Sequence, residues 1–441
     1  MNELAVEYLP PDALVPYLGN ARQHSAEQLR QIARSISEFG FVTAVVVDAQ
    51  NRVIAGHGRL LAAKSLNLTR VPVVRITHLT ETQLRAYRLA DNKIAENASW
   101  DDGLLRVELD FLMSPEVNFD VDLTGFSTPE IDLLIGDEAS AVPEPPLPDG
   151  FESMPVISQL GDIWQLGPHR VACGDCRDHT LLANLFCGER AAMVLTDPPY
   201  NVPIQGNVSG LGKLTHPEFK MASGEMSSGQ FIGFLKESIG AALSVSSAGA
   251  LVYVCMDWRH LWELQEAGKA LGLNLINLAV WVKTNAGMGS LYRSQHELIA
   301  IFKKGSSQHV NNVELGRHGR NRSNVWQYAG MNAFGRDRDQ SLALHPTVKP
   351  IALVMDAIKD VTEHGDIVFD GFLGSGTTVL AAHKTYRRGF GVEFDPRYVD
   401  VSLQRWIALT GQKPLLATTG QPFDEVCELR SSSAIAAGAC L

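Results

Sequence analysis

Cysteine is scarce in this sequence, with six residues in 441, which is too few for a disulfide-built scaffold. A secretory signal is also lacking, because no basic stretch with an apolar run follows Met1. We therefore expect reduced thiols and a cytoplasmic location. Long apolar runs are missing too. The longest uncharged stretch, residues 238–256, holds four Ser and two Gly and predicts a helix end, a turn and a buried strand, with no membrane association.

An excess of positive charge is absent, since the formal net charge is −11, and this argues at first against a nucleic-acid partner. The acidic residues are concentrated, however, in residues 111–155, which carry 10 Asp or Glu and no Lys or Arg. Residues 283–349 carry 10 Lys or Arg against 4 Asp or Glu. A local basic region can hold phosphates whatever the total charge is. Residues 283–349 are therefore a candidate nucleic-acid contact region.

A stiff spacer divides the chain, because four of the six residues 143–148 are proline. We predict an N-terminal domain over residues 1–110, an acidic, Pro-rich linker over 111–155, a large domain over 156–420 and a tail over 421–441. The first domain has the pattern of a small mixed α/β fold. The large domain alternates apolar strands such as 191–196 with helices such as 351–361. That alternation predicts an α/β fold with a Rossmann-like, doubly wound parallel sheet.

A Gly-rich turn lies between a strand that ends near residue 369 and a helix. Such a turn lets backbone N–H groups approach a ligand and aims a helix N-terminus at it. A phosphate-binding loop would need Lys at position 377, which is Thr. Glu393, at the end of the next strand, can accept hydrogen bonds from ribose hydroxyls. The turn predicts a nucleoside-bearing cofactor, and its residues are Phe369, Asp370, Gly371, Gly374, Gly376 and Thr377.

The tetrapeptide Asp197-Pro198-Pro199-Tyr200 follows the predicted strand 191–196 and precedes the Gly-rich turn. Gly174-Asp175 lies upstream of it, and residues 345–350 (His-Pro-Thr-Val-Lys-Pro) lie just before the turn. In this order the motifs resemble the β-class amino-group (N6-adenine/N4-cytosine) DNA methyltransferases, over about residues 156–415. The resemblance implies S-adenosyl-L-methionine as cofactor and double-stranded DNA as substrate.

The resemblance also implies a role for each residue of the tetrapeptide. The exocyclic amine of a base is a poor nucleophile, because its lone pair is conjugated into the ring. The Asp197 carboxylate and the Pro198 carbonyl would accept the amine hydrogens and free that lone pair to attack the sulfonium methyl. Pro198 and Pro199 stiffen the backbone that carries these acceptors. Tyr200 would stack on a base flipped out of the duplex.

The cofactor contacts are implied in the same way. Phe369, Asp370, Gly374 and Gly376 would hold the methionine end, Glu393 the ribose and Asp175 the adenine side. Thr347 and Lys349 would line the same pocket, and Thr377 belongs to the same turn. Gly371 stands where the family often has Pro.

Cys173 and Cys176 have the spacing of a metal pair but no second pair, and we interpret them as reduced core residues, with no metal site.

Asp197 favours adenine N6 as the target over cytosine N4, where Ser is frequent at this position. C5 methylation of cytosine is disfavoured, because none of the six cysteines follows a proline. Cytosine N4 stays an alternative. Another is a nucleotide-dependent DNA-binding protein with a vestigial methyltransferase half.

Within 283–349, Arg and Asn residues suited to base edges and phosphates gather, and the arginines are Arg317, Arg320, Arg322, Arg336 and Arg338.

Residues 9–100 resemble ParB-like domains of the ParB/sulfiredoxin fold. The matching pieces are residues 29–40, the strand 45–47 and the loop Gly56-His57-Gly58-Arg59 with the helix after it. In relatives such a loop binds nucleotide phosphates, and its N–H groups together with Arg59 suit an anion. A nucleotide, a protein partner and a DNA-docking role all stay open for this domain. The oligomeric state, including a dimer, stays open as well.

Overall fold

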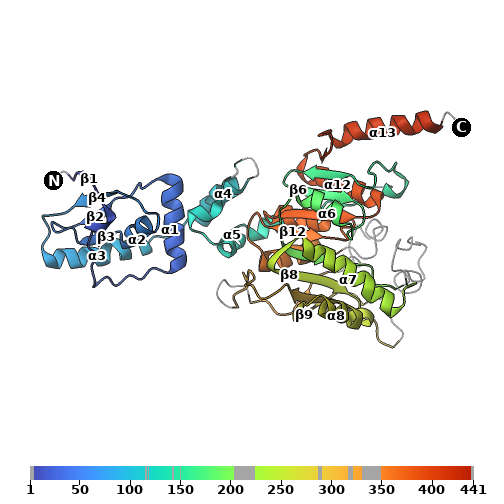
Figure 1. Cartoon of the computed structure of the whole chain (residues 1–441), viewed down its shortest axis with the longest axis horizontal. Helices are drawn as coiled ribbons and strands as arrows, with labels where there is room; N and C mark the ends of the chain where they lie inside the picture. Colours follow the sequence, from blue (N-terminus) through green and yellow to red (C-terminus); the bar gives the residue numbers. More distant parts are fainter. Residues whose placement is uncertain are drawn as a thin grey trace. The chain divides into compact units, whose positions relative to one another are not determined.

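The computed structural model describes residues 4–114, 117, 119–141, 144–148, 150–202, 224–286, 291–315, 321–329 and 349–438, with the side chains of 137–141 and 433–438 left out. The chain divides into two compact units, Met1–Leu134 and Ile135–Leu441 (Figure 1). No helix among the described residues is long and apolar enough to cross a membrane.

The first unit contains a four-stranded mixed sheet with the order β1-β4-β2-β3. β4 runs antiparallel to β1 and parallel to β2, which is antiparallel to β3. Fully buried valines and Leu60 form the core between the sheet and the helices. The predicted mixed α/β fold is confirmed. The elements are β1 Val6–Leu9, α1 Ala26–Phe39, β2 Val45–Val47, β3 Val53–Ala55, α2 His57–Ser65, β4 Val71–Arg75 and α3 Glu81–Glu96.

Two further helices lie in the segment that follows, much of which we expected to be a linker. These are α4 (Asp102–Met113) and α5 (Thr128–Ala141), with a short 3-10 turn between them at Val121–Thr124. Asp101 caps α4 by accepting from the backbone N–H of Leu104 at 3.0 Å. Before α5, the backbone N–H and the hydroxyl of Ser127 both donate to Glu130 Oε2, at 2.8 and 2.7 Å. Helix caps therefore organise this acidic segment locally.

The second unit is built on a ten-stranded sheet with the order β11-β9-β10-β8-β7-β12-β13-β6-β5-β14. Its five central strands, from β8 to β6, are parallel to one another. β10 pairs antiparallel with β8 and β9, and the β5–β6 hairpin lies toward the other edge. The strands are β5 Ile163–Leu166, β6 His169–Cys173, β7 Ala191–Thr196, β8 Ser246–Met256, β9 Asn274–Val282, β10 His296–Lys303, β11 Val325–Gln327, β12 Ile367–Asp370, β13 Arg388–Glu393 and β14 Leu415–Leu416.

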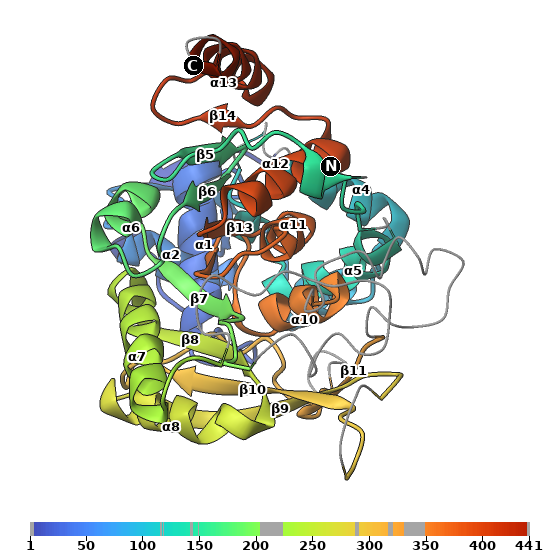
Figure 2. The same cartoon turned by 90° about the vertical axis from the view of Figure 1, so that its right-hand side faces the viewer.

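Helices cover both faces of this sheet (Figure 2). One apolar core lies under α6, α7 and α8, and two others lie under α10, α11 and α12. The arrangement confirms the predicted doubly wound α/β architecture, in which ligands bind at the carboxyl ends of the parallel strands. The helices are α6 His179–Phe186, α7 Ser228–Ser244, α8 Leu261–Ala270, α10 Ile351–Val361, α11 Thr377–Lys384, α12 Pro396–Thr410 and α13 Phe423–Gly438.

Both ends of this unit pack onto the sheet layers. Leu147 and Phe151 are buried against Val401 of α12. At the other end, Phe423 and Val426 of α13 join the core around β5 and β6, within the range expected to be a tail. The second unit therefore includes chain on both sides of the predicted catalytic motifs.

Candidate active site

The residue after β7, Asp197, stands where a parallel strand ends at the ligand-binding edge of the sheet. Its side chain is 19% exposed, and both carboxylate oxygens are engaged. The Tyr200 hydroxyl donates to Oδ1 at 2.5 Å, and Lys349 Nζ donates to Oδ2 at 2.5 Å. Asn201, which has a φ of +54°, fixes the end of the turn, because its side chain bonds the backbone of Gly224 and Met226. The turn that carries Asp197 is thus held from several directions.

A second carboxylate, Glu297 of β10, faces the same lysine. Lys349 Nζ lies 2.9 Å from Glu297 Oε2, and Lys283 Nζ, just after β9, donates to Glu297 Oε1 at 2.5 Å. The Tyr200 hydroxyl lies 3.3 Å from Glu297 Oε2 and accepts from Lys349 at 3.2 Å. Asp197, Tyr200, Lys283, Glu297 and Lys349 make up one group, called here the charge cluster.

The charge cluster is balanced, with two carboxylates and two ammonium groups. Burial raises the pKa of Asp197, and the negative charge of Glu297 raises it further, against the pull of Lys349. Burial would also raise the pKa of Glu297, but Lys349 and Lys283 reverse this and hold it at about 2. Burial alone would lower the pKa of Lys349, yet the two carboxylates raise it above its usual value. Asp197 is therefore the cluster's more basic carboxylate.

The Gly-rich turn after β12 is clamped by its own acid. Asp370 Oδ1 accepts from the Thr196 hydroxyl and from the backbone N–H of Phe372, both at 3.0 Å, and Oδ2 accepts from the Thr378 hydroxyl at 2.7 Å. Burial raises the pKa of Asp370 to about 6. Its carboxylate thus ties β7, the turn and α11 together.

Glu393 at the end of β13 lies beside the turn. It accepts from the backbone N–H of Gly374 at 2.8 Å and from that of Asp395 at 2.8 Å, and burial raises its pKa to about 7. Gly374 has a φ of +56°, and no described atom lies within 4 Å of the place where a Cβ would stand. A half-buried acceptor next to open space is suited to a ligand with hydroxyl groups.

The outer side of the turn is held by Arg405 of α12, whose side chain is 3% exposed. Its Nη1 donates to the Ser375 carbonyl at 2.7 Å, and its Nε donates to the Pro145 carbonyl at 3.0 Å. Its Nη2 pairs with Glu144. The Thr377 hydroxyl lies 3.3 Å from both Arg405 Nη1 and Glu144 Oε1. The Pro-rich segment thus reaches the Gly-rich turn through one buried guanidinium.

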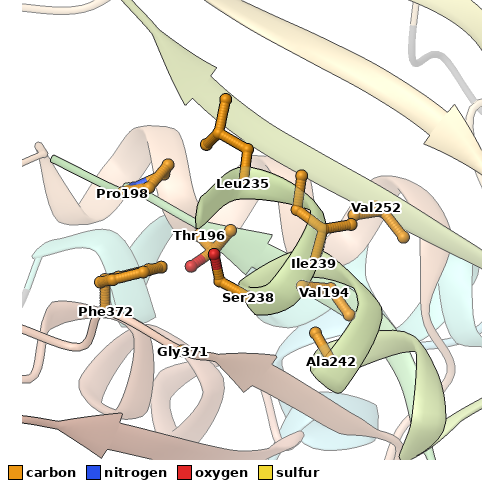
Figure 3. A pocket seen from close by; sticks show the side chains of 10 residues that line it. All are labelled: Val194, Thr196, Pro198, Leu235, Ser238, Ile239, Ala242, Val252, Gly371 and Phe372. Atoms are coloured by element: carbon orange, nitrogen blue, oxygen red, sulfur yellow. The ribbon is translucent and has the colours of Figure 1, made fainter. Parts of the chain in front are cut away.

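A small apolar pocket lies between the two motifs and α7 (Figure 3). Pro198 comes from the catalytic turn, and Gly371 and Phe372 come from the Gly-rich turn. The other lining residues belong to β7, β8 and α7, and they are Val194, Thr196, Leu235, Ser238, Ile239, Ala242 and Val252. Its free space is about 10 Å³, enough for about one water molecule. The pocket shows that Pro198 and the Gly-rich turn face a common space.

Comparisons with known proteins match both units. A family described as DNA methylase matches residues 191–404, one described as ParB-methyltransferase HTH domain matches 103–153, and one described as ParB N-terminal domain matches 1–93. The ParB-like nuclease domain-containing protein YnaK of Escherichia coli K12 is 43% identical over 81 residues, which is 18% of this chain and 93% of that protein. The Type II methyltransferase M.HpaI of Haemophilus parainfluenzae is 25% identical over 228 residues, which is 48% of this chain and 67% of that protein. The chain belongs to the amino-group DNA methylases and carries a ParB-like N-terminal domain.

A solved structure with a similar arrangement is the PvuII DNA methyltransferase, which is described as cytosine-N4-specific. It is 18% identical, with a TM-score of 0.42, and it covers 53% of the methylase and 85% of its own chain. The cofactor of the family is S-adenosyl-L-methionine. The Glu393 acceptor and the open space over Gly374 fit such a group, because its ribose offers hydroxyl donors and the carboxyl groups of Asp370 and Glu393 would attract its positive sulfonium.

Several predicted cofactor residues have partners within the methylase itself. The side chain of Phe369 is buried in the core against Phe186, with ring centroids 5.3 Å apart, so only its backbone can face a ligand. Lys349, expected to line the cofactor pocket, pairs with Asp197. Asp175 is bound by Arg177 Nη2 at 2.7 Å, which lowers its pKa. Thr347 lies outside the described residues.

The basic region of the methylase is used partly inside the fold. Arg322, expected to reach DNA, lies 2.7 Å from Asp356 Oδ2 and 2.9 Å from Asp360 Oδ2, both on α10. Trp281 Nε1 donates to the Tyr328 carbonyl at 3.0 Å. Arg322 thus joins the segment before β11 to α10. The other arginines considered, Arg317, Arg320, Arg336 and Arg338, lie outside the described residues.

The ParB-like domain of the methylase has a second candidate site at the start of α2. Gly56 has a φ of +95°, and His57 Nε2 accepts from the backbone N–H of Tyr17 at 3.3 Å. The guanidinium of Arg88, which is 7% exposed, lies 3.8 Å from the centroid of the Tyr17 ring. Burial lowers the pKa of Arg59 and of His57. The site gathers cationic side chains around a helix N-terminus.

Sequence reasoning missed Glu297 and Lys283 as parts of the site. The antiparallel register of β9 and β10 pairs Glu297 with Trp281, and Lys283, two residues after Trp281, is the diagonal neighbour of Glu297 and within its reach. The one local signal for Glu297 was its carboxylate inside the otherwise apolar strand β10.

Proposed function

We propose that the protein transfers the methyl group of S-adenosyl-L-methionine to adenine N6 at a specific sequence in double-stranded DNA. The observation that carries the proposal is the Asp197 carboxylate at the end of β7, held by Lys349 and Tyr200, while the neighbouring residue Thr196 donates to Asp370 at the start of the Gly-rich turn. An acceptor for the amine and a site for the methyl donor then share one edge of the sheet.

The chemistry follows from the acceptors. The bound cofactor supplies an electrophilic methyl group. Asp197 and the Pro198 carbonyl hold the two amine hydrogens of the target base, so that the nitrogen lone pair points at the methyl carbon. Such preorganised acceptors are worth on the order of 10² in rate or more. Asp197, as the more basic carboxylate of the charge cluster, takes the proton that the nitrogen releases after transfer.

Adenine is favoured over cytosine because the first residue of the catalytic turn is an aspartate. The test is mass spectrometry of nucleosides from plasmid DNA treated with the full-length protein and a deuterated methyl donor. We expect N6-methyladenine. N4-methylcytosine would move the assignment to the alternative substrate, and unmethylated DNA with normal cofactor binding would favour a vestigial catalytic half.

We propose in addition that the ParB-like domain binds an anion, either a nucleotide or a DNA phosphate, at the start of α2. Arg59, Arg88 and the N–H groups after Gly56 support this, because all are donors suited to phosphate oxygens. Calorimetry of a nucleoside triphosphate and of duplex DNA with the full-length protein and its Arg59→Ala variant separates the two ligands. If neither ligand loses affinity in the variant, a protein partner becomes the better hypothesis.

A further inference from the structure

Glu297 is the centre of the charge cluster, although it belongs to neither of the two sequence motifs. Its side chain is 13% exposed and lies 2.5 Å from Lys283, 2.9 Å from Lys349 and 3.3 Å from the Tyr200 hydroxyl. These partners come from three separate segments of the chain. Glu297 therefore joins β10 to both the catalytic turn and the start of α10.

Lys349 is shared between two carboxylates. Its Nζ is 2.5 Å from Asp197 Oδ2 and 2.9 Å from Glu297 Oε2, and its side chain is only 7% exposed. With Glu297 removed, the ammonium group would have Asp197 as its single counter-ion among the described residues. The attraction between Lys349 and Asp197 would then no longer be shared and would strengthen, because a buried charge is compensated by whatever partner remains.

A stronger attraction between Lys349 and Asp197 would weaken Asp197 as an acceptor. Each carboxylate oxygen has about two lone-pair sites, so Asp197 can bind the target amine while it keeps Tyr200 and Lys349. That capacity depends on Lys349 staying to one side and on the carboxylate keeping its basicity. Glu297 provides both conditions, because it draws Lys349 toward β10 and adds a negative charge near Asp197.

We infer that Glu297 is a positioning residue for methyl transfer: it holds Lys349 and offsets its charge, so that Asp197 stays free and basic enough to accept the target amine. This inference rests on the proposed function. Glu297 acts through Asp197 and needs no contact with the base or the methyl donor.

The expected pH effect has a definite sign. The negative charge of Glu297 raises the pKa of Asp197, so its loss lowers that pKa. Loss of Lys283 has the opposite effect, because Glu297 then competes more strongly for Lys349 and a cation leaves the cluster. The titratable and charged groups that act on Asp197 from the surrounding elements are Lys349, Glu297, Tyr200, Cys255 and Asp370.

The test compares full-length Glu297→Gln, Glu297→Asp and Lys283→Gln in DNA methylation assays across pH. For Glu297→Gln we expect the acidic limb of the rate profile to move down by about one pH unit and the plateau rate to fall about tenfold. Lys283→Gln should move that limb upward. Glu297→Asp keeps the charge and should keep the limb in place. Glu266→Gln, an exposed change of the same type on α8, is the control.

Cofactor affinity, measured by calorimetry, should be unchanged in all of these variants. Wild-type limb and plateau in Glu297→Gln would overturn the inference, and so would equal shifts of the same sign in Glu297→Gln and Lys283→Gln. If Glu297→Gln does not fold, the upward shift in the more exposed Lys283→Gln decides the question. A wild-type protein that binds cofactor but methylates no DNA would overturn the proposed function itself.

Discussion

A Gly374→Ala substitution separates the cofactor role of the Gly-rich turn from its role in folding. Gly374 has a φ of +56°, and no described atom lies within 4 Å of the added Cβ, so the change strains the backbone without a clash. A non-glycine residue in this region costs about 1–2 kcal/mol. Gly411, at the end of α12, has a φ of +71° and equally open space among the described residues, which makes Gly411→Ala a matched control.

Both variants should lose about 1 kcal/mol of unfolding free energy in urea titrations. Only Gly374→Ala should lose cofactor affinity, by about tenfold or more, which corresponds to about 1.4 kcal/mol. The reason is that the Gly374 N–H donates to Glu393, so a ligand that binds this carboxylate is expected to lie next to the glycine. Equal S-adenosyl-L-methionine affinity in the two folded variants, measured by calorimetry, would refute the assignment of this turn to the cofactor.

Three further outcomes are expected. Asp197→Asn should slow single-turnover methylation by on the order of 10² or more while calorimetry shows nearly normal cofactor binding; a variant with near-normal turnover would remove Asp197 from the chemistry. Burial raises the pKa of Glu393 to about 7, so protonation makes it a poorer acceptor and cofactor affinity should fall as the pH drops from about 8 to about 6. Glu393→Gln should flatten this pH profile of affinity. A wild-type affinity that does not vary with pH would contradict the role of Glu393. Burial lowers the pKa values of His169 and His383 below 6.5, so these groups take up protons on unfolding. The free energy of unfolding should therefore decline as the pH falls below that value. If the Tm of His169→Gln declines below this pH as steeply as that of the wild type, His169 does not cause the decline.

Local sequence patterns predicted the elements that lie in the middle of the sheet. Residues 191–196 and 351–361 were expected to be a strand and a helix, and they are β7 and α10 with the same bounds. A strand covered on both faces is almost continuously apolar, so its ends are easy to place. The catalytic and Gly-rich turns follow such strands, and their residues could be named for that reason.

The charge cluster could not be predicted in this way. Lys349 could be named from its motif, but Lys283 and Glu297 belong to no motif, and Lys283 has the local pattern of an ordinary solvated charge. Their meeting depends on β10 running antiparallel between β8 and β9, a pairing that no local pattern encodes. The helices α4 and α5 were obscured by the acidic composition around them, although Ser127 and Glu130 carried a recognisable capping signal.

The contact of Glu144 and Pro145 with Arg405 has a consequence for how such proteins can be recombined. A catalytic half cut at residue 156 would keep every motif and still lose the partner of a buried guanidinium that braces the Gly-rich turn. A fusion joint that preserves the methyl-donor site therefore belongs upstream of Glu144. Exchanges of the N-terminal domain between relatives should retain the Pro-rich segment with the catalytic half, as the piece that travels with the enzyme.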